Sequence, residues 1–314
     1  MKPSTPGFSF RVSAQEGHAR TGVLETPHGE VATPTFMPVG TQGCVKALVP
    51  SEVAETGAQV VLGNTYHLML RPGAELVAKL GGLHAFTKWP RAMLTDSGGF
   101  QAFSLAAGKD SLVKLDEEGV TFRSHLDGSK HRLTPEEAVR IQGLLGADIQ
   151  MQLDVCPPGE SPRAVVEDAV RMTTRWAKRA LAASRPEKQA LFGIVQGACF
   201  SDLRLAHAEE LAAMPFDGLA LGGFSVGEPI EKMHETLHEV AHKVDPERPR
   251  YLMGVGTPRD LILGIDAGID MFDCVLPTRN ARNGQALTRF GRVVIKQAQY
   301  REDDSPIDPD CSCP

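Results

Sequence analysis

Three aspartates in this sequence, Asp96, Asp154 and Asp273, stand at or near the ends of short apolar runs. Ionised carboxylates are costly to bury unless they are paired, so packing alone does not explain three of them. Any single one can instead cap a following helix, and that alternative stays open. Paired carboxylates suit glycosidic chemistry, in which one attacks the anomeric carbon and the other transfers a proton.

Amide donors accompany these acids. The carboxamide of Gln196 and the glycine pair Gly222 and Gly223 also follow apolar runs. Together with Asp154 they would offer the mixed donors and acceptors that the edge of a guanine-like heterocycle requires. The sequence contains no Walker loop, no Gly-x-Ser-x-Gly motif and no dinucleotide fingerprint. These residues therefore favour chemistry at a glycosidic bond.

Basic residues gather after the last apolar run. Six of them occur between positions 279 and 301 with no acidic residue among them: Arg279, Arg282, Arg289, Arg292, Lys296 and Arg301. A run of like charge is often only a solvated face. If the run lies beside the three aspartates, however, it favours a strip that binds phosphates. The formal net charge of −6 gives no global signal for nucleic-acid binding, so such binding would depend on this local patch.

The elements that would position these residues form a repeating pattern of apolar runs and helical stretches. The runs cover residues 35–40, 58–63, 91–96, 147–154, 190–196, 217–222, 250–256 and 270–276. Continuously apolar runs are typical of parallel strands buried on both faces. Eight such strands alternating with helices predict an α/β fold of the (β/α)8 TIM-barrel type, with an open doubly wound sheet as the alternative. A barrel would bring the acids to one mouth, at the carboxyl ends of its strands.

We expect one catalytic barrel domain over residues 1–314, with two segments that break the pattern. Residues 1–34 contain alternating polar and apolar side chains with a turn at His28, and they predict an N-terminal β-hairpin that caps the barrel. Residues 109–132 alternate in the same way around Asp127, and they predict a hairpin inserted after the third strand.

Three histidines, His234, His238 and His242, are spaced i, i+4 and i+8 on a helix predicted over residues 229–244. Two histidines at this spacing can chelate a metal ion. The same helix is rich in Glu and Lys, which favours a solvated face instead.

Cysteine content and hydropathy indicate the cellular compartment of the protein. Six cysteines in 314 residues are too few for a disulfide framework. Cys311 and Cys313 match half of a tetrahedral zinc site, and we interpret residues 279–314 as the start of a basic, zinc-binding insertion. No apolar run approaches the roughly 18 residues of a membrane helix, and residues 1–10 lack a signal-peptide core, so we expect a cytoplasmic protein.

The chain resembles the tRNA-guanine transglycosylases, also called queuine tRNA-ribosyltransferases, of the bacterial type. The resemblance runs from Phe8 to Pro314 and is carried by seven motifs in order. They are Leu62-Gly-Asn-Thr-Tyr-His-Leu68, Thr95-Asp-Ser-Gly-Gly-Phe-Gln101, Gln152-Leu-Asp-Val-Cys156, Gly193-Ile-Val-Gln-Gly197, Leu221-Gly-Gly-Phe-Ser-Val-Gly-Glu228, Tyr251-Leu-Met-Gly-Val-Gly256 and Phe272-Asp-Cys-Val-Leu-Pro-Thr-Arg279. Such a set is far more specific than a single glycine pattern.

The resemblance implies an activity and a mechanism. It implies that the guanine at the wobble position of a tRNA anticodon is exchanged for a 7-deazaguanine precursor of queuosine, which for the bacterial type is 7-aminomethyl-7-deazaguanine. Asp273 would be the nucleophile that attacks the ribose C1′ and forms a covalent tRNA–enzyme intermediate. Asp96 would be the general acid/base that handles the proton of the leaving and incoming bases.

The resemblance also implies a pocket for the base. Its residues would be Ser97, Phe100, Asp154, Cys156, Gln196, Gly222, Gly223, Glu228 and Met253. Phe100 and Met253 would sandwich the faces of the base, and Glu228 would meet the ammonium of the 7-substituent. Arg279 and Arg282 would hold phosphates of the tRNA. The Phe-Ser pair at positions 224–225 departs from the Leu-Ala common in this loop, which leaves the details of the 7-substituent pocket open.

The resemblance further implies a structural zinc ion and a homodimer. The zinc motif of the family continues as Cys-x-Cys-x-x-Cys with a later His, so we expect the sequence to be C-terminally truncated and to hold only the ligands Cys311 and Cys313. Two other functions stay open, a non-catalytic tRNA-binding subunit of the same fold and a barrel glycoside hydrolase. The three aspartates argue against the first, and the scarcity of aromatic sugar platforms argues against the second.

Overall fold

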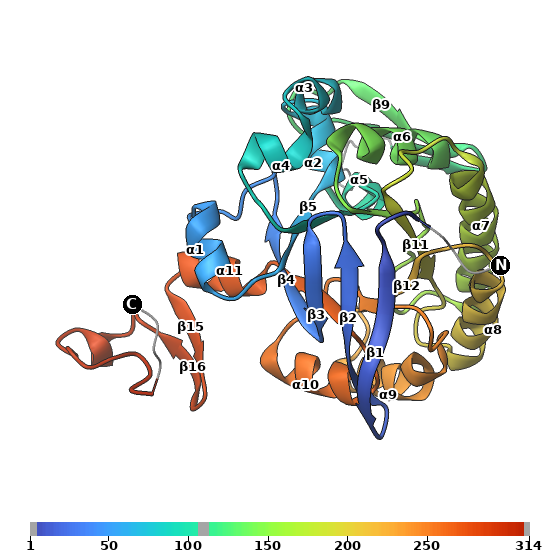
Figure 1. Cartoon of the computed structure of the whole chain (residues 1–314). Helices are drawn as coiled ribbons and strands as arrows, with labels where there is room; N and C mark the ends of the chain where they lie inside the picture. The colour runs from blue at the N-terminus through green and yellow to red at the C-terminus, as the bar shows by residue number, and fades with distance from the viewer. Residues whose placement is uncertain (1–4, 106–112, 311–314) are drawn as a thin grey trace.

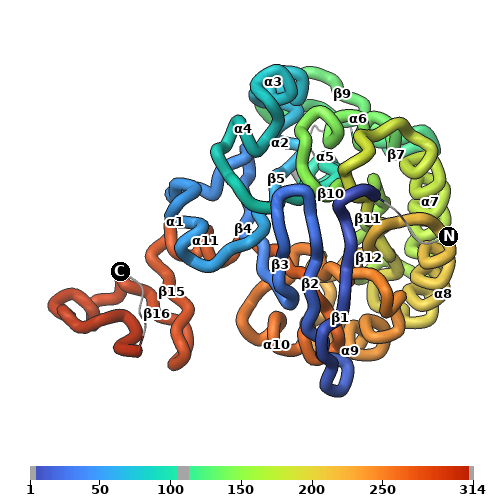
Figure 2. The backbone as a smooth tube through the Cα atoms, in the orientation of Figure 1, coloured from blue at the N-terminus to red at the C-terminus, as the bar shows by residue number. Residues whose placement is uncertain are grey.

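A computed structural model of the protein describes residues 5–105 and 113–310. Eight parallel strands close into a barrel, each hydrogen-bonded to the next and the last to the first (Figure 1, Figure 2). They are β4 (Thr35–Gly40), β5 (Val60–Gly63), β6 (Ala92–Thr95), β10 (Ile149–Met151), β11 (Ala190–Val195), β12 (Gly218–Leu221), β13 (Arg250–Leu252) and β14 (Met271–Cys274). The predicted TIM barrel is confirmed, and every strand lies inside one of the eight apolar runs.

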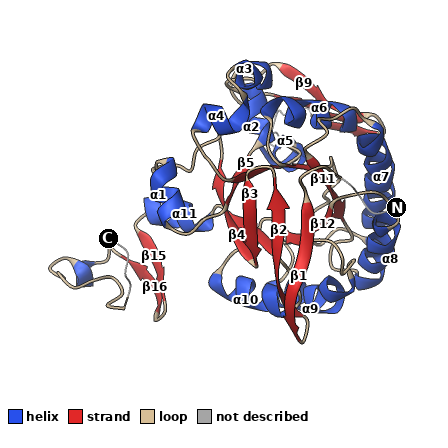
Figure 3. Ribbon diagram, viewed as in Figure 1, coloured by secondary structure: helices blue, strands red, loops and turns tan. Residues whose placement is uncertain are grey.

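Apolar side chains cover both sides of the barrel wall. Met37, Ile149 and Phe192 belong to a buried cluster that fills the barrel interior, together with Tyr251. Helices surround the outside (Figure 3). They are α1 (Pro50–Glu55), α2 (Thr65–Leu70), α3 (Ala74–Lys79), α4 (Gly82–Thr87), α5 (Gly99–Leu105), α6 (Pro135–Leu145), α7 (Arg163–Ala182), α8 (Ser201–Ala212), α9 (Ile230–Val240), η1 (Ala241–Lys243), α10 (Pro258–Asp266) and α11 (Leu276–Arg282). Burial on both faces explains why the strands are mostly apolar, with buried polar residues such as Gln150, Arg250 and Asp273 as exceptions.

Capping residues fix where two of these helices begin. The hydroxyl of Thr134, before α6, accepts the backbone N–H of Glu137 at 3.2 Å. Thr257 and Asp260 cap α10 reciprocally, because each side chain accepts the backbone N–H of the other residue. A proline follows the capping residue in both helices, where the missing N–H costs no hydrogen bond.

The segment before the barrel has three strands, where the sequence predicted a two-stranded hairpin. β1 (Ser9–Glu16), β2 (Ala19–Thr26) and β3 (Gly29–Thr33) form one antiparallel sheet (Figure 1). The prediction missed a second turn at Gly17, whose φ of +59° suits glycine. Leu24 and Val31 of this sheet pack against the interior cluster of the barrel.

The segment inserted after the third barrel strand also has one strand more than predicted. It consists of β7 (Lys114–Asp116), β8 (Gly119–Arg123) and β9 (Lys130–Leu133). Asp127 lies in the connection between β8 and β9, as predicted. The additional turn forms where Asp116 Oδ1 accepts the backbone N–H groups of Glu118 and Gly119 at 3.1 and 3.2 Å. Residues 109–112 of the predicted insertion lie outside the described residues.

The chain leaves the barrel through α11 and continues into a small hairpin. This hairpin consists of β15 (Gln285–Thr288) and β16 (Gly291–Val294), and η2 (Ala298–Tyr300) follows it. The segment projects away from the barrel (Figure 1). The predicted zinc ligands Cys311 and Cys313 lie outside the described residues. Within the described ranges, no helix is both long enough and apolar enough to cross a membrane.

Candidate active site

A cavity of about 420 Å³ lies at the carboxyl ends of the barrel strands, where the sequence predicted the mouth. Asp96 directly follows β6, Asp154 follows β10, and Asp273 lies in β14. All three carboxylate residues line the cavity. Seven other predicted site residues line it as well: Ser97, Phe100, Cys156, Gly222, Gly223, Met253 and Arg279.

The two oxygens of the Asp273 carboxylate have different surroundings. Oδ1 accepts the hydroxyl of Tyr251 at 2.6 Å and the backbone N–H of Gly254 at 2.7 Å. Oδ2 has no hydrogen bond from the residues that the structure describes. Burial raises the pKa of Asp273, and it raises the pKa of Tyr251 well above its usual range, so the tyrosine remains a proton donor. The carboxylate is thus held at one oxygen and available at the other.

The Asp96 carboxylate accepts four hydrogen bonds. Oδ1 accepts the backbone N–H groups of Thr65 at 2.8 Å and Gly98 at 3.1 Å. Oδ2 accepts the side-chain amides of Asn64 at 2.7 Å and Gln101 at 3.2 Å. Burial nevertheless raises the pKa of Asp96 to about 7, and the nearby negative charge of Asp273 adds to the rise. A rigidly held carboxyl with this pKa can both donate and accept a proton near neutral pH.

Asp154 and Gln196 form a buried pair. Nε2 of Gln196 donates to Asp154 Oδ2 at 2.6 Å, and Oε1 of Gln196 has no hydrogen-bond partner in the described part of the chain. Burial raises the pKa of Asp154 to about 6, although the bond from Gln196 opposes the rise. Gln196 itself lies behind the cavity wall, so its direct effect is to orient Asp154.

Two glycines allow the chain to approach Gln196 closely. A Cβ on Gly223 would lie 2.3 Å from Gln196 Oε1, and one on Gly222 would lie 2.8 Å from Nε2. The N–H of Gly222 donates to the carbonyl of Val195 at 3.1 Å, whereas the N–H of Gly223 has no acceptor among residues 5–105 and 113–310. Of the two predicted glycine donors, only that of Gly223 is therefore available to a ligand.

Arg204, which the sequence analysis missed, connects the two strand ends that carry these groups. It is fully buried, and its guanidinium donates to the carbonyls of Ala198 at 2.5 Å, Val195 at 3.3 Å and Gly223 at 3.2 Å. Its Cζ lies 3.6 Å from the ring centroid of Phe224. Burial lowers the pKa of Arg204 to about 10, which still leaves it charged at neutral pH. An arginine in a surface helix gives no sequence signal for such a role.

The remaining cavity residues offer flat or neutral surfaces. Phe100 on α5 is 47% exposed, and Met253 follows β13, so both are available to an aromatic ligand. Ser97 Oγ accepts the backbone N–H of Gly99 at 3.3 Å. Burial raises the pKa of the Cys156 thiol to about 12, so this cysteine is neutral and a weak nucleophile.

Three predicted site residues in the described ranges do not line the cavity: Gln196, which lies behind its wall, Glu228 and Arg282. The Glu228 carboxylate accepts the backbone N–H groups of Ser225 and Val226, the latter at 2.9 Å. It therefore holds the loop after β12, and a ligand would have to displace these donors to bind it. Arg282 lies on α11, three residues beyond Arg279, outside the cavity wall.

The cavity lining also includes residues that were not predicted as part of the site, among them Asn64, His67, Gln101 and Tyr251. Asn64 directly follows β5, so the same strand-end rule that identified the acids could have found it. Tyr251 stands inside an apolar strand, where its hydroxyl gives no signal of its own. The site thus holds Asp273, which has an unpartnered oxygen, and Asp96, which titrates near neutrality. Asp273 can act as a nucleophile while Asp96 acts as an acid and base.

The family model and the similar proteins agree on one family. A family model described as "Queuine tRNA-ribosyltransferase" matches residues 15–314. A protein of that name from Sorangium cellulosum is 71% identical over 310 residues, which cover 99% of this chain and 77% of the relative. Another from Nitratidesulfovibrio vulgaris is 56% identical over 313 residues, covering 99% of this chain and 82% of the relative.

Proposed function

The chain belongs to the queuine tRNA-ribosyltransferase family, and from this premise we propose that it exchanges the guanine at the wobble position of a tRNA anticodon for a 7-deazaguanine precursor of queuosine. The incoming base would be 7-aminomethyl-7-deazaguanine. The proposal is carried by one observation, the presence in one cavity of Asp273 with an unpartnered oxygen and Asp96 with a pKa of about 7.

The first step forms one bond and breaks another. A loop nucleotide leaves its stack at low cost and can place its ribose in the cavity. Asp273 Oδ2 attacks C1′, and the bond from C1′ to guanine N9 breaks with its electron pair on the base. A neutral Asp96 carboxyl supplies the proton that the departing guanine takes up. Tyr251 and Gly254 remain bonded to Oδ1, which becomes the carbonyl oxygen of the ester.

The second step repeats this chemistry in the opposite direction. Ionised Asp96 accepts the proton of the incoming base, whose N9 attacks C1′ while Asp273 leaves as a carboxylate. Two displacements at the same carbon retain its configuration. The ester conserves the energy of the glycosidic bond between the two steps, so no further energy source is needed.

Recognition of the base rests on Asp154 and Gly223. The Asp154 carboxylate would accept the N1–H and the exocyclic amino group of guanine, held in place by Gln196. The available N–H of Gly223 would donate to the guanine 6-oxygen. A 7-deazaguanine carries the same edge, so one pocket can hold the outgoing and the incoming base in turn.

Incorporation of isotope-labelled guanine into unmodified tRNA tests the proposal. A glycoside hydrolase would break the bond without re-forming it, and a non-catalytic subunit would do neither. Asp273→Ala should remove both the incorporation and the tRNA-linked band on a denaturing gel. A band that persists in this variant would reject the role of Asp273. Absence of incorporation by a folded parent that still binds tRNA would reject the exchange.

Other expectations rest on the family and remain proposals. Cys311 and Cys313 would supply two thiolates to a structural zinc ion. Arg279 and Arg282 would hold phosphates of the tRNA, and two chains would form a homodimer. A cytoplasmic location follows from the proposed tRNA substrate.

A further inference from the structure

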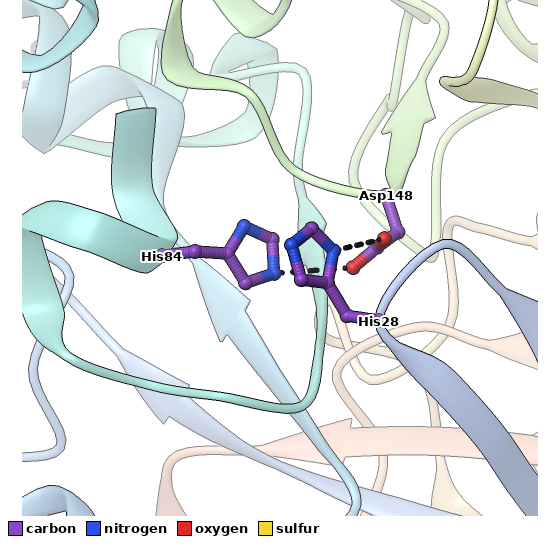
Figure 4. Close-up of side chains that lie close together, drawn as sticks. All are labelled: His28, His84 and Asp148. Atoms are coloured by element: carbon purple, nitrogen blue, oxygen red, sulfur yellow. Dashed lines mark hydrogen bonds and ion pairs between the residues drawn. The ribbon is translucent and has the colours of Figure 1, made fainter. Parts of the chain in front are cut away.

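Two histidines and one aspartate meet at the end of the barrel opposite the acidic cavity. His28 lies in the turn between β2 and β3, His84 in α4, and Asp148 directly before β10 (Figure 4). Their ligand atoms all lie within 4.8 Å of one another, and no other group of three His, Cys, Asp or Glu residues in the described ranges does so. The three residues come from separate segments, so the fold itself creates the cluster.

Asp148 is the fixed centre of the cluster. Its side chain is 1% exposed, and its Oδ2 accepts the backbone N–H of Met93 at 2.8 Å. His28 Nδ1 lies 2.7 Å from Oδ1, and His84 Nε2 lies 3.2 Å from Oδ2. Each imidazole therefore directs one ring nitrogen at the carboxylate (Figure 4). The same nitrogen of His84 also lies 3.1 Å from the carbonyl oxygen of Arg91.

Within the described residues, no permanently charged cation pairs with the cluster. A buried carboxylate is costly unless it is paired. The ionic partners of Asp148 within the described residues are His28 and His84, which are charged only when protonated, and no lysine or arginine pairs with it there. A divalent ion would supply positive charge under conditions where both imidazoles are neutral and can act as ligands.

We propose that His28, His84 and Asp148 bind a divalent transition-metal ion of the Zn²⁺, Co²⁺ or Ni²⁺ class. Two imidazole nitrogens and one carboxylate oxygen are a donor set that these ions accept, with a water molecule in the fourth position. That position is accessible because the His28 side chain is 39% exposed. The N–H of Met93 holds Oδ2, so it orients the carboxylate and leaves Oδ1 as the ligand atom.

Binding requires the His28 ring to rotate. The rings of His28 and His84 stack with centroids 3.5 Å apart and planes 10° apart. Two parallel rings cannot both direct a nitrogen lone pair at one ion. His84 is enclosed, whereas His28 projects from a turn whose backbone is held by Thr26, since its hydroxyl accepts the His28 N–H at 3.2 Å. The bound ion would connect the N-terminal sheet to α4 and β10.

Calorimetric titration of the full chain with Zn²⁺ tests the site. The chain should carry Cys311→Ser and Cys313→Ser as a background, so that no thiolate of that pair competes for the ion. We expect one ion per chain. His28→Gln and His84→Gln should each weaken binding by about tenfold or more, because each removes one of three protein ligands. The Co²⁺ form should show no thiolate charge-transfer band, and its visible spectrum should change in His28→Gln, which loses one nitrogen ligand.

His242→Gln is the matched control. His242 also stacks on another histidine, His18, at a different turn of the same sheet, with centroids 3.9 Å apart. Its removal should leave the affinity unchanged. His28→Gln changes a residue in an exposed turn, and circular dichroism checks that this variant folds. It therefore tests the proposed metal site even if His84→Gln fails to fold. No binding by the background chain, or equal affinity in His28→Gln, would overturn the proposal.

Discussion

Tyr251 donates its hydroxyl to Asp273 Oδ1 at 2.6 Å, across two neighbouring strands of the barrel. β13 supplies the tyrosine and β14 the aspartate, so strand pairing fixes their distance. The hydrogen bond falls on one carboxylate oxygen only. It therefore orients the other oxygen toward the cavity without occupying it.

Tyr251→Phe should lower kcat about 10- to 100-fold, because a hydrogen bond to a charged group contributes about 1.5–3 kcal/mol. The KM for guanine should change little, since the hydroxyl holds the nucleophile and not the base. Steady-state incorporation of labelled guanine measures both constants. An unchanged kcat would show that Gly254 alone suffices to orient Asp273.

Asp96→Asn should gain stability relative to the parent as the pH rises. Burial raises the pKa of Asp96 from 3.8 to about 7 in the folded chain. Between these values the folded state binds more protons than the unfolded state, so the contribution of Asp96 to the free energy of unfolding falls with increasing pH. Asn does not titrate. The free energy of unfolding of Asp96→Asn, relative to that of the parent, should therefore increase by on the order of 1 kcal/mol per pH unit.

Urea unfolding of parent and Asp96→Asn from about pH 4 to about pH 8 measures this difference. Comparing the two chains cancels the contribution of Asp154, whose pKa burial also raises. Asp273 interacts with Asp96 through charge, so its changed titration is part of the measured difference. A difference that stays constant with pH would contradict the raised pKa of Asp96. The variant should show no base exchange at any pH in this range.

Arg204→Met should raise the KM for guanine by roughly tenfold, because the loop after β12 loses a charged donor worth about 1.5 kcal/mol. Met preserves an apolar contact with Phe224 but cannot donate to the carbonyl of Gly223. Arg163→Met is the matched control, since Arg163 also lies over a phenylalanine, Phe200, but on the exposed surface. Reduced stability with an unchanged KM would limit Arg204 to a structural role.

Arg279→Ala and Arg282→Ala should each weaken tRNA binding and reduce the slope of log affinity against log salt by about one. Arg279 borders the cavity, and Arg282 follows it on α11. Fluorescence anisotropy at several salt concentrations measures the slope. Arg175→Ala, which removes an exposed arginine paired with Glu117, is expected to leave it unaltered. If all three variants kept the slope of the parent, Arg279 and Arg282 would not contact tRNA phosphates.

The barrel could be predicted because its strands are mostly apolar on both faces and a glycine or a polar residue stands at or near the end of each. The two three-stranded sheets were each predicted with one strand too few. Polar–apolar alternation continues through a tight turn, so it does not show where one strand ends and the next begins. The turns at Gly17 and Asp116 depend on one backbone angle and one side-chain acceptor, and both signals are weak in a sequence.

The acids of the site were found from the position of each at a strand end. The residues that control them were not, because their roles depend on contacts between strands and not on position within one. Tyr251 lies in an apolar strand, and Arg204 lies in a surface helix. The availability of the Gly222 and Gly223 N–H groups also depends on a neighbouring strand, because the carbonyl of Val195 accepts the N–H of Gly222.

Side chains such as Met37 and Phe192 fill the barrel beneath the cavity, and the N-terminal sheet packs below them. Among the described residues, these side chains close the barrel below the cavity. In the proposed exchange, a displaced guanine would leave through the same opening by which its replacement enters, while the ribose stays esterified to Asp273. The two bases would therefore pass this opening one after the other, which is compatible with the ping-pong order that the proposed ester intermediate requires.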